Sequence, residues 1–221
     1  MPKMIKGRAK KAGLSPGTLV HIGEKRETAA TISAIAYDAS QFNEKIDLSV
    51  PESLSFRNTG GTIWVNIEGI HQLDLIEALG NGFGLHPLVL EDIANTDQRP
   101  KMEDHGDYLY LVLKMLTLTS DRPVGHQEIV TEQVSFILGS HFVLSFQEGI
   151  KGDVFASVRE RLRNAKGRIR SLGADYLLYS LLDAIVDHYF VVLENLGEKI
   201  EVLEEELVSH SREKTLQTIH H

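Results

Sequence analysis

One amphipathic segment near the carboxyl end constrains the fold of this chain more than any other feature. Between residues 174 and 208, apolar side chains recur at alternating spacings of four and three residues. They are Leu182, Val186, Tyr189, Leu193, Leu196, Ile200, Leu203 and Leu207. This heptad spacing predicts a single helix, which at about 1.5 Å per residue spans roughly 52 Å. We expect much of such a helix to lie against another long helix, either in an antiparallel hairpin of the same chain or in a coiled coil with a second chain.

The same segment is too acidic to be predicted as a membrane span. It contains Asp175, Asp183, Asp187 and Glu194, and a carboxylate in the hydrocarbon core of a bilayer costs about 3 kcal/mol. We therefore interpret it as a helix surrounded by water and protein. At the other end of the chain, residues 1–17 are rich in basic side chains but precede no apolar core, so we predict a flexible basic tail and no secretory signal.

Charge and cysteine content exclude several classes of function. The 221 residues include 31 acidic and 23 basic side chains, for a formal net charge of -8. A general nucleic-acid partner is not expected, because a polyanion would be repelled. The chain has no cysteine, which excludes disulfides, iron–sulfur clusters and thiolate zinc sites, so a metal would need oxygen or imidazole ligands.

The middle of the chain alternates between strand patterns and helix patterns. Runs of β-branched and apolar residues predict strands at residues 18–22, 31–37, 62–68, 108–116, 132–138 and 141–146. Helical spacing begins at His71, and a second short helix is predicted to start at Pro87, a residue favoured in the first turn. The alternation predicts an α/β domain over residues 18–150, with a mixed β-sheet flanked by helices.

From residue 151 onward the chain is predicted to be helical. A basic amphipathic helix over residues 154–166 precedes the long heptad helix, and a new helical pattern begins after residue 211, with Ser211 as its N-cap. That last pattern stops after about two turns, which is too short for an independent helix. We therefore expect residues 151–221 to be a helical region and the chain to be a fragment cut within a helix.

Motifs of common enzyme classes are missing from the sequence. No Gly-x-Gly-x-x-Gly follows a strand, and neither a phosphate-binding loop nor Gly-x-Ser-x-Gly occurs. Glycines 80, 82 and 84 close a predicted helix instead of opening one, so we interpret them as caps. Histidines 86, 105, 126, 141 and 188 lie on different predicted elements without a zinc-hydrolase spacing. We predict that the chain is not an enzyme.

Three carboxylates are candidates for binding a hard cation. Glu91 and Asp92 lie next to each other near the end of the second short helix. Adjacent helical residues point about 100° apart, so one chain would not easily chelate one ion with both. Two interpretations stay open: an acidic pair neutralised by Arg99 or Lys101, or ligands for a divalent cation. Asp183 lies beside the heptad residue Leu182, and its alternative is an exposed acidic stripe.

Several short motifs also occur in a fixed order along most of the chain. They are Phe83-Gly-Leu-His-Pro-Leu-Val-Leu-Glu-Asp-Ile, Asp97-Gln-Arg-Pro-Lys101, Leu113-Lys-Met, Glu132-Gln-Val-Ser-Phe, Phe142-Val-Leu-Ser-Phe-Gln-Glu148, Val158-Arg-Glu-Arg-Leu162 and Ala174-Asp-Tyr-Leu-Leu-Tyr-Ser-Leu-Leu-Asp-Ala-Ile-Val-Asp. In this order they resemble the cytoplasmic domain of the CorA family of magnesium and cobalt transporters. The resemblance covers roughly residues 18–221.

The resemblance implies a homopentameric channel whose α/β domain lies on the cytoplasmic side of the cell membrane. For residues 151–221 it implies a long α-helical hairpin followed by the start of a stalk helix. The rest of the stalk, two membrane helices and a Gly-Met-Asn filter would follow residue 221, so this chain would meet the membrane only through a segment that it lacks.

A regulatory role is also implied by the resemblance. In the family, intracellular Mg²⁺, with Co²⁺ as an alternative, binds between neighbouring cytoplasmic domains and favours the closed state. By motif, Asp92 is the first candidate ligand, with Glu91 beside it and Asp183 as a secondary contributor, and a partner carboxylate would lie beyond His221. Two alternatives remain: the zinc-transporting branch of the same superfamily, and a helical scaffold or interaction module without an ion role.

Overall fold

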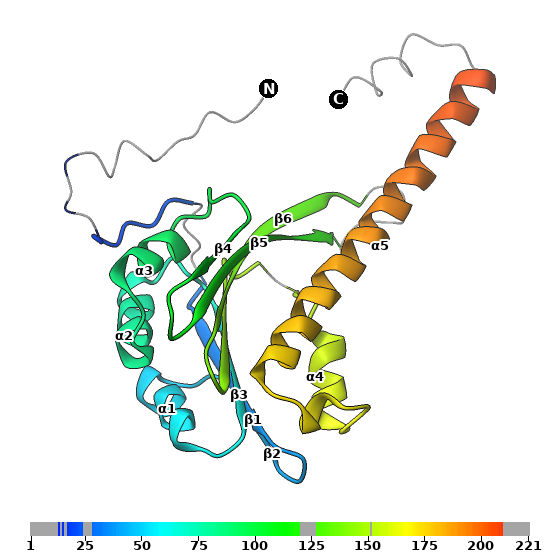
Figure 1. Ribbon diagram of the computed structural model, residues 1–221. Helices are drawn as coiled ribbons and strands as arrows, with labels where there is room; N and C mark the ends of the chain where they lie inside the picture. The colour runs from blue at the N-terminus through cyan, green and yellow to red at the C-terminus, as the bar shows by residue number, and fades with distance from the viewer. Residues whose placement is uncertain are drawn as a thin grey trace.

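A seven-stranded mixed β-sheet lies between two layers of helices (Figure 1). The computed structural model describes residues 13, 15, 17–23, 28–119, 127–150 and 152–209. The strands are β1 (Thr31–Tyr37), β2 (Phe42–Lys45), β3 (Thr62–Glu68), β4 (Lys101–Asp104), β5 (Leu109–Leu118), β6 (Ile129–Leu138) and β7 (Phe142–Gln147). Their order in the sheet is β2-β1-β3-β7-β6-β5-β4, and β3 and β7 run parallel while the other neighbours are antiparallel.

The two helical layers cover opposite faces of this sheet. One layer contains α1 (Val50–Ser55), η2 (Phe56–Asn58), α2 (Leu73–Phe83) and α3 (Pro87–Ile93); the other contains α4 (Ala156–Arg163), η3 (Ile169–Ser171) and α5 (Ala174–Ser209). Alternating residues of one strand separate the layers: Ile63 and Val65 of β3 pack with α2 and α3, whereas Trp64 packs with α4 and α5. The predicted fold class, a mixed sheet flanked by helices and followed by a long helix, is confirmed.

The first half of α5 belongs to the core of the domain. Its buried face carries Leu177, Leu181 and Ile185, which pack with apolar residues of the sheet and of α4. This face is offset from the predicted heptad seam, because Leu193 and Ile200 of that seam are 59% and 55% exposed. The long helix is therefore confirmed, but its first half lies on the sheet and not on a second long helix.

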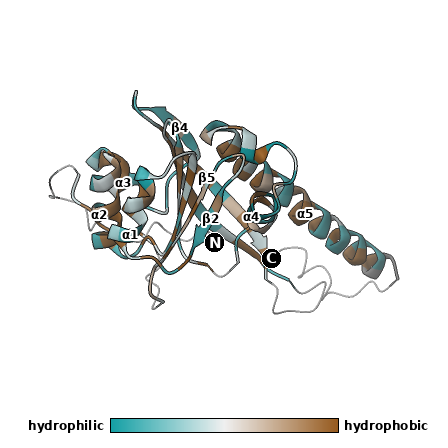
Figure 2. Cartoon of the chain, turned by 90° about the horizontal axis from the view of Figure 1, so that it is seen from below, coloured by the Kyte–Doolittle hydropathy of each residue, from teal (hydrophilic) through white to brown (hydrophobic). Residues whose placement is uncertain are grey.

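The second half of α5 extends past the edge of the sheet (Figure 1). Figure 2 shows that apolar residues continue along this part of the helix. By length and composition alone, the stretch Ala174–Glu205 is long and apolar enough to cross a membrane. Its first half instead contributes to a protein core, in keeping with the interpretation drawn from its acidic residues.

Several predicted elements are confirmed, whereas the first predicted strand and two of the predicted glycine caps are wrong. The strands at residues 31–37 and 62–68 form as expected. Residues 18–22 do not form a strand. Within this segment only Ile22 makes a β-bridge, an isolated parallel one to Asn95, which lies outside the sheet. Of the three predicted glycine caps, only Gly84 caps α2, with φ at +72°. Gly80 lies inside α2, where an added Cβ would come within 2.4 Å of Leu90.

The helical region after residue 151 differs in length from the prediction. Its basic helix is α4, Ala156–Arg163, shorter at both ends than predicted, and it leads through η3 into α5. The predicted N-cap Ser211, the start of the stalk helix and most of the basic tail lie outside the described residues. The domain boundary between residues 150 and 151 stays a prediction.

Candidate metal centre

The short helix α3 fixes the direction of the two adjacent carboxylates. Pro87 occupies the first turn, and the Nδ1 atom of His86 caps the helix by accepting the backbone N–H of Leu88 at 3.2 Å. The buried face of α3 is formed by Val89, Leu90 and Ile93. Glu91 and Asp92 follow Leu90 in the sequence and keep part of their surface exposed to solvent.

Asp92 is held by two neighbours on its own chain. Its Oδ1 atom accepts the side-chain amide of Gln98 at 2.6 Å, and its Oδ2 atom lies 2.6 Å from Nζ of Lys101. Lys101 is the first residue of β4, which pairs antiparallel with β5 and so folds back toward α3. Lys101, one of the two residues predicted to neutralise the acidic pair, forms an ion pair with Asp92, so this carboxylate has a counter-ion on its own chain.

Lys101 also interacts with a second carboxylate and with an aromatic ring. Its Nζ lies 2.8 Å from Oε1 of Glu103 and 5.5 Å from the centre of the Tyr110 ring. Burial lowers the pKa of Lys101, but its hydrogen bonds to Asp92 and Glu103 outweigh that effect and raise the pKa above the ordinary value. The side chain therefore carries a full positive charge at neutral pH.

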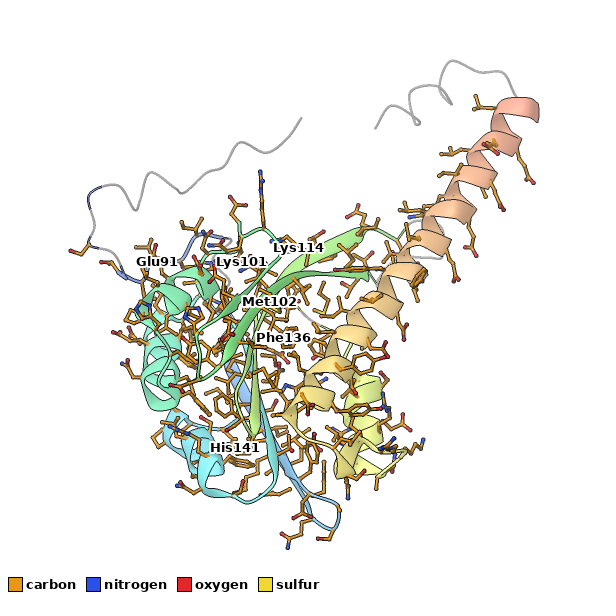
Figure 3. The ribbon with its side chains drawn as sticks, viewed as in Figure 1. Glu91, Lys101, Met102, Lys114, Phe136 and His141 are labelled. Carbon is orange, nitrogen blue, oxygen red and sulfur yellow. The ribbon has the colours of Figure 1, made fainter. Side chains whose placement is uncertain are left out.

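Glu91 is tied to the segment that precedes the sheet. Its Oε2 atom accepts the backbone N–H of Gly17 at 3.0 Å, and the bridge between Ile22 and Asn95 holds the same segment farther along. Figure 3 shows Glu91 on α3 and Lys101 on β4 toward the same end of the molecule. The acidic pair thus lies where α3, β4 and residues 17–22 meet.

The third predicted ligand lies on the other side of the sheet. Asp183 is exposed on α5. Helix α5 packs with α4 on one face of the sheet, whereas α3 packs on the opposite face. Within one chain the structure brings Glu91 and Asp92 together but leaves Asp183 apart from them. Among the described residues, no three carboxylate, histidine or cysteine side chains gather in a way that would hold a metal ion.

The acidic pair offers only part of the ligand set that Mg²⁺ prefers. Mg²⁺ prefers six oxygen ligands in an octahedron and commonly keeps several of its waters, with one or two protein carboxylates. Glu91 and Asp92 supply carboxylate oxygens of the right kind. The remaining positions would need waters or oxygens from a second chain.

Two features near this site were not predicted from the sequence. His86 and His105, which come from different elements, have ring centres 6.5 Å apart, and His105 stacks on Tyr108 at 5.0 Å. Nε2 of His105 lies 3.6 Å from Oε2 of Glu103. Asp92, Lys101, Glu103 and His105 thus form one chain of contacts between alternating carboxylate and nitrogen groups. Their proximity depends on the antiparallel pairing of β4 with β5, which the spacing of residues along the sequence does not predict. His126, another histidine considered above, falls outside the described residues.

A buried acid lies elsewhere, on β6. Glu132 is 2% exposed, and its Oε1 atom accepts the backbone N–H groups of Gly149 and Ile150 at 2.9 and 3.3 Å. Burial raises the pKa of Glu132 to about 7, and the nearby charge of Glu148 adds to the shift. This carboxyl group has a structural role in the turn after β7 and is not a candidate ligand.

Comparison with known proteins decides the family. Residues 59–220 match the family model of the CorA-like Mg²⁺ transporter protein. The chain belongs to the CorA family. It is 48% identical over 210 residues to the cobalt/magnesium transport protein CorA of Thermotoga maritima, an alignment that covers 95% of this chain and 58% of that protein. It is also 29% identical over 142 residues to the putative metal ion transporter YfjQ of Bacillus subtilis, covering 64% of this chain and 41% of that one. This CorA-family chain therefore spans about half the length of these relatives.

Solved structures share the fold at low sequence identity. The complete CorA magnesium transporter of Methanocaldococcus jannaschii matches with a TM-score of 0.60 and 15% identity, over 88% of this chain and 56% of that chain. The cytoplasmic domain of ZntB from Vibrio parahaemolyticus matches with a TM-score of 0.55 and 13% identity, over 87% of this chain and 70% of that chain. The same fold thus occurs in both proteins.

Proposed function

We propose that this CorA-family chain is the cytoplasmic regulatory part of a homo-oligomeric, pentameric Mg²⁺ and Co²⁺ channel. In this proposal Glu91 and Asp92 of one subunit, with Asp183 of its neighbour as a secondary contributor, hold Mg²⁺ between subunits and favour the closed state. The 48% identity to a cobalt/magnesium transport protein supports the choice of cation. Conduction belongs to parts of the transporter beyond the cytoplasmic domain.

The observation that carries the proposal is the separation of the candidate ligands by the sheet. Asp92 and Asp183 lie on opposite helical layers of the same domain. In a closed ring of identical chains, contacts are head-to-tail, so one side of a subunit meets the opposite side of the next. Ligands on two different faces are therefore suited to a site that forms only between neighbours.

Electrostatics explains how occupancy of such a site would control the ring. Two carboxylates 4 Å apart repel by about 4 kcal/mol at an effective dielectric constant near 20. A divalent cation between them reverses the sign of that interaction. Subunit packing is then linked to the Mg²⁺ concentration, and loss of the ion shifts the population toward a looser arrangement without a chemical step.

A titration of the chain with divalent cations tests this function. Thermal unfolding and sedimentation are followed in parallel with Mg²⁺, Co²⁺ and Zn²⁺, for the unmodified chain and for Asp92→Asn. At ten times the Kd, binding to the folded state adds about 1.4 kcal/mol, which raises the Tm by about 3–5 °C in a protein of this size. We expect Asp92→Asn to lose this increase.

A matched variant separates a specific ligand from general charge effects. Asp187 is exposed on α5, one turn after Asp183, so Asp187→Asn removes the same charge from a place that the proposal does not use. It should keep the full response. A chain whose Tm and sedimentation ignore all three ions would support the scaffold interpretation, and a response to Zn²⁺ alone would support the zinc-transporting branch.

A further inference from the structure

Lys101 holds the position beside Asp92 that a bound cation would take. Its ammonium group is 2.6 Å from Oδ2 of Asp92, and the two side chains are only 29% and 27% exposed. An ion pair with this degree of shielding is screened less by salt than one on an open surface. A divalent cation that coordinates Oδ2 directly would sit about 2.1 Å from that oxygen. The ammonium group would then face a like charge at short range and would have to move away.

The structure provides the lysine with a second set of partners. Oε1 of Glu103 lies 2.8 Å from the ammonium nitrogen, and the Tyr110 ring lies 5.5 Å away. Both are on the neighbouring strands β4 and β5, and neither involves Asp92. A small rotation of the lysine side chain toward Glu103 would release Asp92 while the ammonium group keeps a counter-ion and a cation–π contact.

We propose that Lys101 is an intramolecular competitor for the cation site. Its ammonium group neutralises Asp92 when no divalent ion is bound, and it withdraws to Glu103 and Tyr110 when one binds. This inference rests on the proposed function and concerns the same site. The competition lowers the affinity for divalent ions, and therefore sets the concentration at which the site fills.

The same competition favours divalent over monovalent ions. Replacing the ammonium group by K⁺ or Na⁺ exchanges one single positive charge for another, and so brings little Coulomb energy. A doubly charged ion interacts with the carboxylate twice as strongly at the same distance and is able to displace the lysine. Lys101 is therefore a specificity-determining residue for the site, although it is not a ligand.

Calorimetric titration of the 221-residue chain with Mg²⁺ tests the proposal. Lys101→Met removes the charge and keeps an unbranched apolar side chain, whereas Lys101→Arg keeps the charge as a matched control. We expect about tenfold tighter Mg²⁺ binding in Lys101→Met and at most about a twofold change in Lys101→Arg. Excess K⁺ should weaken Mg²⁺ binding more in Lys101→Met than in the unmodified chain. Lys101→Gln replaces Lys101→Met if that variant does not fold.

A second substitution tests the withdrawal of the lysine to Glu103. Glu103→Gln removes the alternative counter-ion, so the ammonium group should stay longer with Asp92 and Mg²⁺ binding should weaken by about threefold. If the effect acts through the lysine, Glu103→Gln should have no effect in the Lys101→Met background. An equal effect in both backgrounds would show that Glu103 acts only through its own charge and would overturn this part of the proposal.

The outcomes distinguish this inference from the proposed function. If the unmodified chain binds Mg²⁺, Asp92→Asn does not, and Lys101→Met binds with unchanged or weaker affinity, then the competitor role is wrong and the site stands. If neither the unmodified chain nor Lys101→Met binds, both are wrong. Binding by Lys101→Met alone would support the competitor role in its strongest form.

Discussion

The two halves of α5 both carry regularly spaced apolar side chains but have different surroundings. In the first half, Leu177, Leu181 and Ile185 are almost fully buried between the sheet and α4. In the second half, Leu193 and Ile200 belong to the predicted heptad seam yet are more than half exposed. Hydropathy alone therefore predicts the helix but does not tell which of its turns a single chain covers.

The difference shows that the first half of α5 is part of the packed domain, whereas the second half makes few contacts with it. The first half covers the hydrophobic core between the sheet and α4, so its side chains are fixed by intramolecular packing. The second half touches the rest of the chain at few described points, among them the contacts of Asn195 and Lys199 with Gln127 at the tip of the β5–β6 pair. Substitutions in the two halves should therefore differ sharply in their effect on stability.

The largest effect is expected in the first half. Leu181 is completely buried, so Leu181→Ala removes buried apolar surface and leaves a cavity between α5 and the sheet. We expect the free energy of unfolding to fall by about 3–4 kcal/mol, measured by urea denaturation of the 221-residue chain. A loss below about 1 kcal/mol would mean that the first half does not pack on the sheet as described.

An intermediate effect is expected from Glu132, the buried acid on β6. Glu132 has the same strand parity as Val134 and Phe136, which pack in the core with α5. Its pKa is raised from 4.5 to about 7 in the folded state. Between these values the folded state binds more protons than the unfolded state, so stability falls as the pH rises, and the loss is complete above pH 7.

Glu132→Gln should remove this pH dependence. At pH 8 the variant is expected to be more stable than the unmodified chain by about 2 kcal/mol, and at pH 4 the two should be similar or the unmodified chain better. Urea denaturation at both pH values measures the difference. An unmodified chain that gains stability relative to Glu132→Gln as the pH rises would contradict the burial of a neutral acid at this position.

The smallest effect is expected in the second half. Leu193→Ala makes the same chemical change as Leu181→Ala, on the same helix, at a residue that is 59% exposed. Its effect should stay within about 0.5 kcal/mol in dilute solution. Repeating the measurement at increasing protein concentration sharpens the comparison. A loss as large as that of Leu181→Ala would show that the second half is covered in solution by something beyond the described residues.

The sequence predicted the longest and most regular elements best. β3 and α5 form as expected because each follows a clear period over its whole length. The short strands β2 and β4 were not predicted, since each has four residues and alternates only between partly and fully exposed positions. Residues 18–22 have strand-like composition but only Ile22 finds a backbone partner. Short segments depend on which neighbours the fold supplies, and local composition does not contain that information.

The candidate site was predicted in part. Glu91 and Asp92 were identified by their motif, and Lys101 was named as one of two residues that would neutralise them. The second pairing of Lys101 with Glu103, and the contacts of Gln98 and Gly17 with the acidic pair, were not predicted. They depend on the return of β4 beside β5 and on the path of residues 17–22 over α3, which are tertiary features.

The parallel pairing of β3 with β7 has a consequence for how this chain is made. It joins two antiparallel groups, β2-β1-β3 and β7-β6-β5-β4, whose members otherwise pair with strands near them in the sequence. Across the junction, Asn66 and Ser145 are bonded although they are 79 residues apart in the chain. During synthesis the inner edge of β3 must therefore wait unpaired until β7 has emerged. Such late, non-local pairing slows folding and exposes an apolar edge to aggregation, so the yield of folded protein should depend on how quickly residues 69–147 follow β3 out of the ribosome.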